Sequence, residues 1–202
     1  MLFPLFLLFL FRTAPCLAAD APVTTAATIT NAGKTAGGTS VPLIVTGFND
    51  IGGFTLTLRF NITRALYVGA SPNPALSGMS VVYTPPSTGS VGKIVLSWTG
   101  AANVSLPDSA HLADLSFTYL YGTADLVWGY TSGNVCSYQT WSGGSLTTLN
   151  DLPKTSYYIN GAISERTAPV TSVADLGNPA AGPLAIPVTV SGFDNIGAIT
   201  LT

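Results

Sequence analysis

The chain has 202 residues, enough for one large domain or two small ones, and only 8% of them are charged. The formal net charge of −2 leaves no basic surface that could neutralise phosphate groups, which argues against a nucleic-acid partner. Surface polarity must come from Ser, Thr and exposed backbone, a composition that favours strands and turns over solvated helices.

Residues 1–19, MLFPLFLLFLFRTAPCLAA, are an apolar run followed by small residues. This pattern is typical of a secretory signal peptide, and the run is shorter than the roughly 20 apolar residues of a spanning helix. We expect cleavage near Ala18 or Ala19, giving a secreted or cell-surface protein without a membrane span. No basic segment precedes the apolar run, so the natural start could lie upstream of Met1. Cleavage would remove Cys16 and leave Cys136, which we expect to be a small buried side chain.

Beyond the signal, apolar and polar residues alternate in runs that Gly, Pro, Asn and Ser separate. Alternation with period two is the pattern of half-buried β-strands. It predicts about nine strands in residues 22–164, at 26–30, 41–46, 54–60, 66–70, 79–83, 93–98, 115–120, 124–128 and 157–164. Two packed sheets are the economical way to bury so many half-apolar strands, so we expect an all-β sandwich.

An internal repeat begins in the same region. Residues 41–57, VPLIVTGFNDIGGFTLT, and 186–202, IPVTVSGFDNIGAITLT, are identical at nine of seventeen positions with an offset of 145. The tetrapeptide APVT occurs at 21–24 and again at 168–171, with an offset of 147. We therefore expect a linker at 165–168, a second copy that starts at 169, and a natural protein that continues beyond Thr202.

Four segments in this order resemble the cohesin domain of cellulosome-type assemblies: VPLIVTGFNDIGGFTLTLRF at 41–60, KIVLSWTG at 93–100, LADLSFTYL at 112–120 and YYINGAIS at 157–164. The resemblance covers residues 22–164 and again 169–202. It implies a nine-stranded jelly-roll β-sandwich that is not an enzyme. It also implies an exposed sheet face that binds a dockerin module of another protein, in a polysaccharide-degrading or cell-surface assembly.

Strand parity selects the residues of that face. In two strands that we expect to be central, 54–60 and 93–98, the apolar even-numbered positions should face the core and the odd-numbered positions should point outward. The outward set that we predict to bind the partner is Thr55, Thr57, Arg59, Lys93, Val95 and Ser97.

Carbohydrate binding is the alternative function, because sandwiches of this superfamily also include cellulose-binding modules and sugar rings stack on exposed aromatic rings. Trp98 and Trp128 share the parity of apolar neighbours and should be buried. Trp141, with Tyr138, lies in a segment that we expect to be an exposed loop, and these two residues are the candidates for a polysaccharide site. A structural spacer in a surface adhesin is the third possibility.

Catalytic and metal sites have less support. Ser109, His111 and Asp114 could suggest a hydrolase, but strand alternation would place Asp114 on the opposite side from the other two, and no nucleophile elbow is present. Asn49-Asp50 and Asp194-Asn195 recur in the two copies, where they could ligate calcium or shape a turn. Turn chemistry explains both pairs, so we expect no cofactor.

Overall fold

The computed structural model of the chain describes residues 19–32, 38–131, 133–165, 169–175, 177, 181–192 and 198–200. The expected signal peptide therefore lies outside the described residues, except for Ala19, as does the expected linker, except for Glu165. The described part is almost entirely β-structure, which confirms the predicted fold class. Within it, no helix has the length and hydropathy that crossing a bilayer requires.

The sandwich consists of thirteen strands and one short helix in the described residues from Val23 to Glu165. In chain order they are β1 (Val23–Ala26), β2 (Ile29–Ala32), β3 (Thr39–Thr46), β4 (Ile51–Asn61), β5 (Ala65–Pro72), β6 (Ser80–Thr84), β7 (Val91–Val104), β8 (Ala110–Tyr119), β9 (Thr123–Trp128), β10 (Ser137–Ser142), β11 (Ser145–Thr148), α1 (Lys154–Tyr157), β12 (Tyr158–Ile159) and β13 (Gly161–Glu165).

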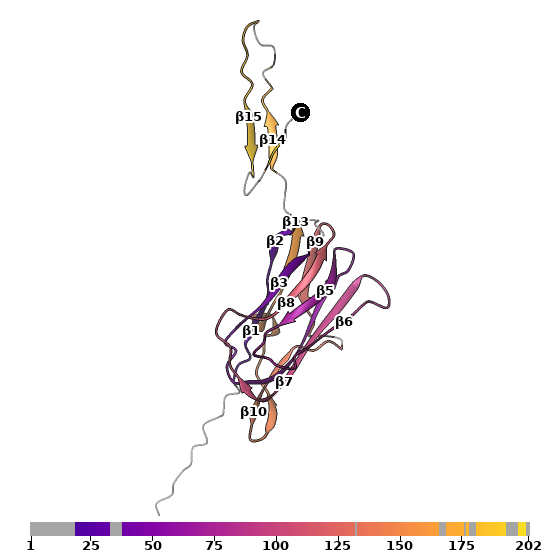
Figure 1. Ribbon diagram of the computed structural model, residues 1–202, viewed down its shortest axis with the longest axis vertical. Helices are drawn as coiled ribbons and strands as arrows, with labels where there is room; N and C mark the ends of the chain where they lie inside the picture. The colour runs from indigo at the N-terminus through magenta and orange to yellow at the C-terminus, as the bar shows by residue number, and fades with distance from the viewer. Residues whose placement is uncertain are drawn as a thin grey trace, which may run out of the picture.

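Two sheets form the layers of the sandwich. The five-stranded sheet has the order β12-β1-β3-β8-β5, and its strands β3, β8 and β5 lie side by side in Figure 1. The eight-stranded sheet has the path β11-β10-β4-β9-β13-β2, and β7 and β6 extend it from the other edge of β4. Strand β4 is thus central: it pairs with β7 along one edge and with both β10 and β9 along the other.

The core lies between the two sheets and follows the predicted alternation. Even-numbered residues of β4, and of β7 as far as Trp98, are buried, among them Phe54, Leu56 and Leu96, and both Trp98 and Trp128 are buried as predicted. Fully burying one such side chain contributes about 1.5–3 kcal/mol relative to leaving it exposed. Since β4 and β7 are held from inside by this packing, their outer face is a rigid surface.

The strand boundaries differ from the sequence expectation at the ends of the sandwich. The segment 137–144, expected to be a loop, forms most of the hairpin β10–β11. The expected strand 157–164 is divided at Asn160, so that β12 joins the five-stranded sheet and β13 the eight-stranded one. Short strands that change sheet give weak period-two signals, because too few residues alternate on either side of the corner.

A separate hairpin follows the sandwich and consists of β14 (Val170–Val173) and β15 (Val188–Ser191). Its register pairs Val170 with Ser191 and Val173 with Val188. Subtracting the repeat offset of 147 from the residue numbers of β14 and that of 145 from those of β15 gives the corresponding residues of the first copy. These are residue 23 paired with 46 and residue 26 paired with 43, which are the pairings between β1 and β3. The pairing expected of a second copy is therefore present, while Asp194 and Asn195 lie outside the described residues.

Candidate partner-binding face

The predicted partner-binding residues lie on one face of the eight-stranded sheet. The register between β4 and β7 places Thr55 opposite Ser97 and Arg59 opposite Lys93, with Val95 between them on β7. The intervening residues are buried in the core, so these side chains share the outward side. The parity argument from sequence is thereby confirmed, whereas the binding role of the residues stays a prediction.

Neighbouring strands widen this surface. On β6, Val82 lies opposite Val95 and Thr84 opposite Lys93, and on β9, Val127 lies opposite Arg59. Val82, Val91 and Val127 are exposed by 53, 44 and 39%, respectively. We call the outward residues of β6, β7, β4 and β9 the outer face; it combines exposed apolar side chains with hydroxyl groups and two cations.

Thr57 is a correction to the predicted set. It points outward but is only 3% exposed, because the segment 129–136, which links β9 to β10, covers it. The backbone N–H of Val135 donates to Oγ1 of Thr57 over 3.3 Å, and the N–H of Thr57 donates to Sγ of Cys136 over 3.5 Å. Both β9 and β10 pair with the same edge of β4, so the chain between them must loop over that edge. Thr57 cannot contact a partner in this arrangement.

The two cations of the outer face lack internal partners. The described sandwich contains four Lys and Arg residues. Two of them are engaged: the guanidinium of Arg64 lies 4.3 Å from the ring centre of Tyr121, and Nζ of Lys154 lies 2.5 Å from a carboxylate oxygen of Asp151. Arg59 and Lys93 make no ion pair with any residue whose position the structure describes. Their charges are therefore free to meet a charge from outside.

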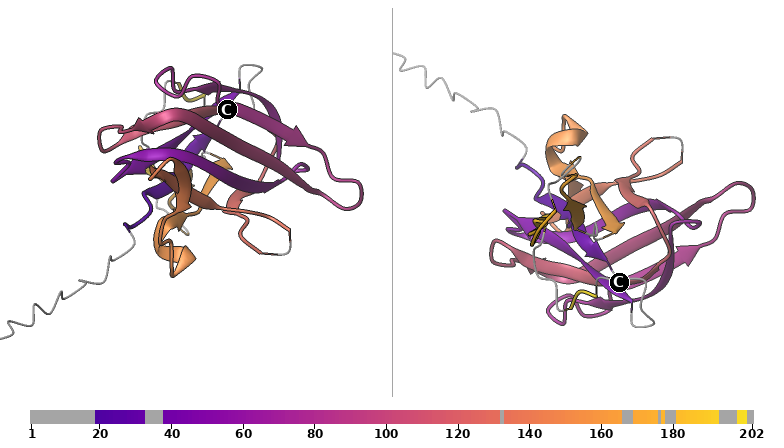
Figure 2. Two further views of the ribbon diagram at one scale, coloured as in Figure 1. Left: turned by 90° about the horizontal axis from the view of Figure 1, so that it is seen from below. Right: turned by 90° about the horizontal axis from the view of Figure 1, so that it is seen from above.

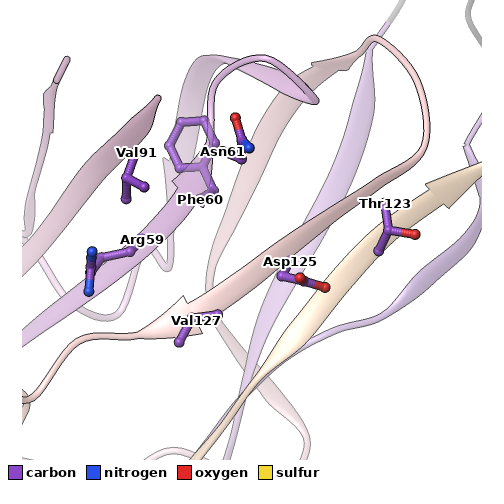
Figure 3. Close-up of a pocket in the computed structure, with 7 residues that line it drawn as sticks. All are labelled: Arg59, Phe60, Asn61, Val91, Thr123, Asp125 and Val127. Atoms are coloured by element: carbon purple, nitrogen blue, oxygen red, sulfur yellow. The ribbon is translucent and has the colours of Figure 1, made fainter. Parts of the chain in front are cut away.

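Two hollows open on either side of Arg59. The first, the strand hollow, has a volume of about 280 Å³, and Figure 3 shows Arg59 and Val91 on one side of it with Asp125 and Thr123 on the other. The second, the loop hollow, has a volume of about 510 Å³ and is lined by Arg59, Lys93, residues 84–91 and Asn134. The tip of the β6–β7 hairpin and the segment between β9 and β10 project on the same side in Figure 2, and residues of both line the loop hollow.

The structure buries one of the two residues predicted for a polysaccharide site. Tyr138 is fully buried, its hydroxyl lies 2.6 Å from Oγ1 of Thr24, and burial raises its pKa. This prediction was wrong, because a ring inside the core cannot stack on a sugar. Trp141 is half-buried in β10 rather than exposed in a loop, and its indole N–H donates to the carbonyl oxygen of Gly100 over 2.8 Å. Its ring also packs on Gly52, where a Cβ would collide with Cδ1 of the indole.

His111 and Asp114 meet, contrary to the alternation argument. Nδ1 of His111 lies 2.9 Å from a carboxylate oxygen of Asp114. An irregularity in the β3–β8 register makes Leu112 and Ala113 both buried, so the flanking residues emerge on the same side. Ser109 is not among the residues that line the adjacent hollow of about 160 Å³. The pair is partly exposed, and no group of three or more potential metal ligands gathers anywhere in the described chain.

The Asn49-Asp50 turn is shaped by its backbone. Asp50 adopts a left-handed φ of 53°, and its N–H donates to Oγ of Ser105 over 2.9 Å. Asp and Asn tolerate this conformation better than most residues, which explains their presence here without an ion. Calcium binding by this turn stays an untested alternative.

Cys136 is buried, as predicted, and burial raises the pKa of its thiol to about 11. The folded protein thus holds the thiol proton more tightly than the unfolded chain, whose reference value is 9.0. Its contribution to stability is present below pH 9 and is lost as the pH rises towards 11. We expect the urea midpoint to fall over this interval, and to fall less in Cys136→Ala. If the urea midpoint changes equally with pH in the two proteins, a role for this thiol is contradicted.

No protein-family model matches the chain, and no curated protein matches it. Its architecture defines it as a two-sheet β-sandwich with an exposed, rigid outer face, and the fold is that of cohesin domains. The seventh ScaB type I cohesin from Pseudobacteroides cellulosolvens matches with a TM-score of 0.54 at 17% identity, over 79% of this chain and 97% of that one. A type I cohesin in a cohesin–dockerin complex from Clostridium thermocellum matches with a TM-score of 0.54 at 6% identity, over 72% and 99%. The sixth cohesin of scaffoldin B from Acetivibrio cellulolyticus, in complex with a mutant dockerin, has a TM-score of 0.52 at 14% identity, over 72% and 99%.

Proposed function

We propose that this protein is a secreted, non-catalytic interaction module that binds a dockerin-type partner through its outer face. The cohesin fold supports the proposal, since two of the similar structures are complexes of a cohesin with a dockerin. The predicted signal peptide supports an extracellular location. The repeat supports an array of such modules in one chain.

The observation that carries the proposal is the composition of the outer face. Exposed valines from β6, β7 and β9 surround the unpaired Arg59 and Lys93, all on strands that the core holds in place. Protein interfaces of standard size cover about 800 Å² per partner, with apolar anchors at the centre and polar groups around them. A preformed sheet surface of this kind can bind without paying for the ordering of a loop.

Among the described residues, no contact of the two candidates favours carbohydrate binding. Of its two candidate residues, Tyr138 is inside the core, and the indole N–H of Trp141 is already satisfied by Gly100.

A substitution among the exposed valines of the outer face tests the proposal. We expect Val82→Asp to weaken binding to a dockerin by about tenfold or more, because it places an unpaired charge within the apolar contact. Isothermal titration calorimetry against recombinant dockerin modules encoded by the same organism measures the effect.

Val68→Asp is the matched control, because Val68 is 65% exposed on β5 in the opposite sheet. Equal loss of affinity in both variants would place the contact elsewhere. Absence of binding between the unsubstituted protein and every dockerin from its own organism would refute the function.

A further inference from the structure

We propose that the partner inserts an acidic side chain into the loop hollow, where its carboxylate contacts both Arg59 and Lys93. This inference rests on the proposed function, since it specifies the chemistry of the partner that binds the outer face. The occupant is a carboxylate of a protein, supplied by Asp or Glu.

The first argument is the placement of the two cations. Arg59 and Lys93 are directly opposite each other in neighbouring strands, and both point outward. Like charges in such a pair repel each other and destabilise a sheet. Neither has an ion-pair partner among the residues described, although the sandwich's other two described cations are both engaged. An anion that bridges the pair would relieve the repulsion and gain two charge-assisted contacts.

The second argument is the lining of the loop hollow. Besides the two cations, its walls contribute hydroxyl groups and an amide, and no Asp or Glu is among the lining residues. The hydroxyl groups belong to Thr84, Ser87, Thr88 and Ser90, and the amide to Asn134. Hydroxyl and amide N–H groups can donate further hydrogen bonds to a carboxylate. The volume of about 510 Å³ is ample for one acidic side chain.

The third argument is the orientation of Arg59. The backbone of Gly129 lies so close that a Cβ added there would be 3.1 Å from Cδ of Arg59 and 3.0 Å from Cβ of Asn134. The aliphatic part of Arg59 is therefore packed beside Gly129 and Asn134. This packing already restricts the side chain before a partner binds, so less conformational entropy is lost on binding. A cation restricted in this way binds an anion at lower entropic cost.

Asp125 determines which of the two hollows the acidic group enters. It lines the strand hollow together with Arg59, but it does not line the loop hollow. An incoming carboxylate is repelled by Asp125 in the first and meets only cations and neutral groups in the second. The partner is thus directed to the side of Arg59 that faces Lys93.

The test uses the whole chain and a short labelled peptide of alternating Glu and Ala, measured by fluorescence anisotropy at low ionic strength. We expect the unsubstituted protein to bind this peptide and not the corresponding Lys peptide. The double variant Arg59→Gln, Lys93→Gln should bind the Glu peptide about tenfold more weakly or worse. Arg64→Gln, which removes a cation outside the outer face, is the matched control and should bind as the unsubstituted protein does.

A thermal melt of the double variant serves as the check on folding. Its midpoint should be unchanged or higher, because the substitutions remove a repulsion. A lower midpoint would contradict the argument from the cation pair.

The outcomes separate this inference from the proposed function. If a dockerin binds the unsubstituted protein and the double variant equally well, the acidic anchor is refuted while the function stands. If no dockerin binds but the Glu peptide does, the anion site stands and the dockerin function fails. Tighter binding of polygalacturonate than of the Glu peptide would show that the hollow takes an acidic polysaccharide, and would overturn the assignment to a protein.

Discussion

Replacing Gly161 by Ala is expected to lower the free energy of unfolding by about 4 kcal/mol or more, enough to unfold much of a domain of ordinary stability. Gly161 is the first residue of β13, and a Cβ built on it would collide with the carbonyl oxygens of Ala26 and Ala27. These atoms belong to the corner where the chain leaves β1 in one sheet and enters β2 in the other.

The collision cannot be relieved by a side-chain rotation, because the atoms that are struck are backbone. Strand β13 is also held on both edges, by β9 and by β2, so it has no free side towards which to move. The added methyl group must therefore separate the sheets locally or break one of these ladders. Either change exposes core residues around Ala26, which is only 1% exposed.

Gly69→Ala is the matched control for this prediction. Gly69 lies in β5, no atom approaches within 4 Å of a Cβ at that position, and its φ is not in the left-handed region. Its substitution should change the free energy of unfolding by no more than about 0.5 kcal/mol. Urea unfolding followed by tryptophan fluorescence measures both variants. Similar midpoints for the two would show that the backbone at the corner can shift to accommodate the added methyl group.

The parts of the fold that could be predicted from sequence are those that depend on local alternation. Counting residues along each strand separately is enough to predict that Trp98 and Trp128 lie inside and that Arg59 and Lys93 lie outside. The period of two is a property of the extended backbone itself, so it holds wherever a strand is regular. The same counting failed at Asp114, because the irregularity at Leu112 and Ala113 shifts the phase within β8.

The parts that could not be predicted depend on contacts between distant segments. Thr57 has the correct parity for the outer face, yet it is covered by a segment more than seventy residues further along the chain. Trp141 was expected in an exposed loop because its neighbours are Ser and Gly, but its ring packs on Gly52 and its indole N–H donates to the carbonyl oxygen of Gly100. The missing side chain at Gly52 is a signal that could have been recognised, since it leaves space for an indole on this strand.

Tyr138→Ala should have the second large effect, a loss of about 3–5 kcal/mol in the free energy of unfolding. The ring packs at right angles to Phe48, with 6.0 Å between ring centres, and lies parallel to Tyr158 at 6.4 Å. Its hydroxyl group is hydrogen-bonded to Oγ1 of Thr24. Since Tyr138 belongs to β10 and Thr24 to β1, this one side chain connects the two sheets.

A double-mutant cycle separates the ring from its hydroxyl group. Tyr138→Phe keeps the packing but leaves the fully buried Oγ1 of Thr24 without its partner, which should cost about 1–3 kcal/mol. Adding Thr24→Val removes the orphaned group, so the double variant should be less destabilised than the sum of the two single variants. If the energies of the two substitutions simply add, the hydrogen bond does not couple the sheets, and the ring packing alone accounts for the burial of Tyr138.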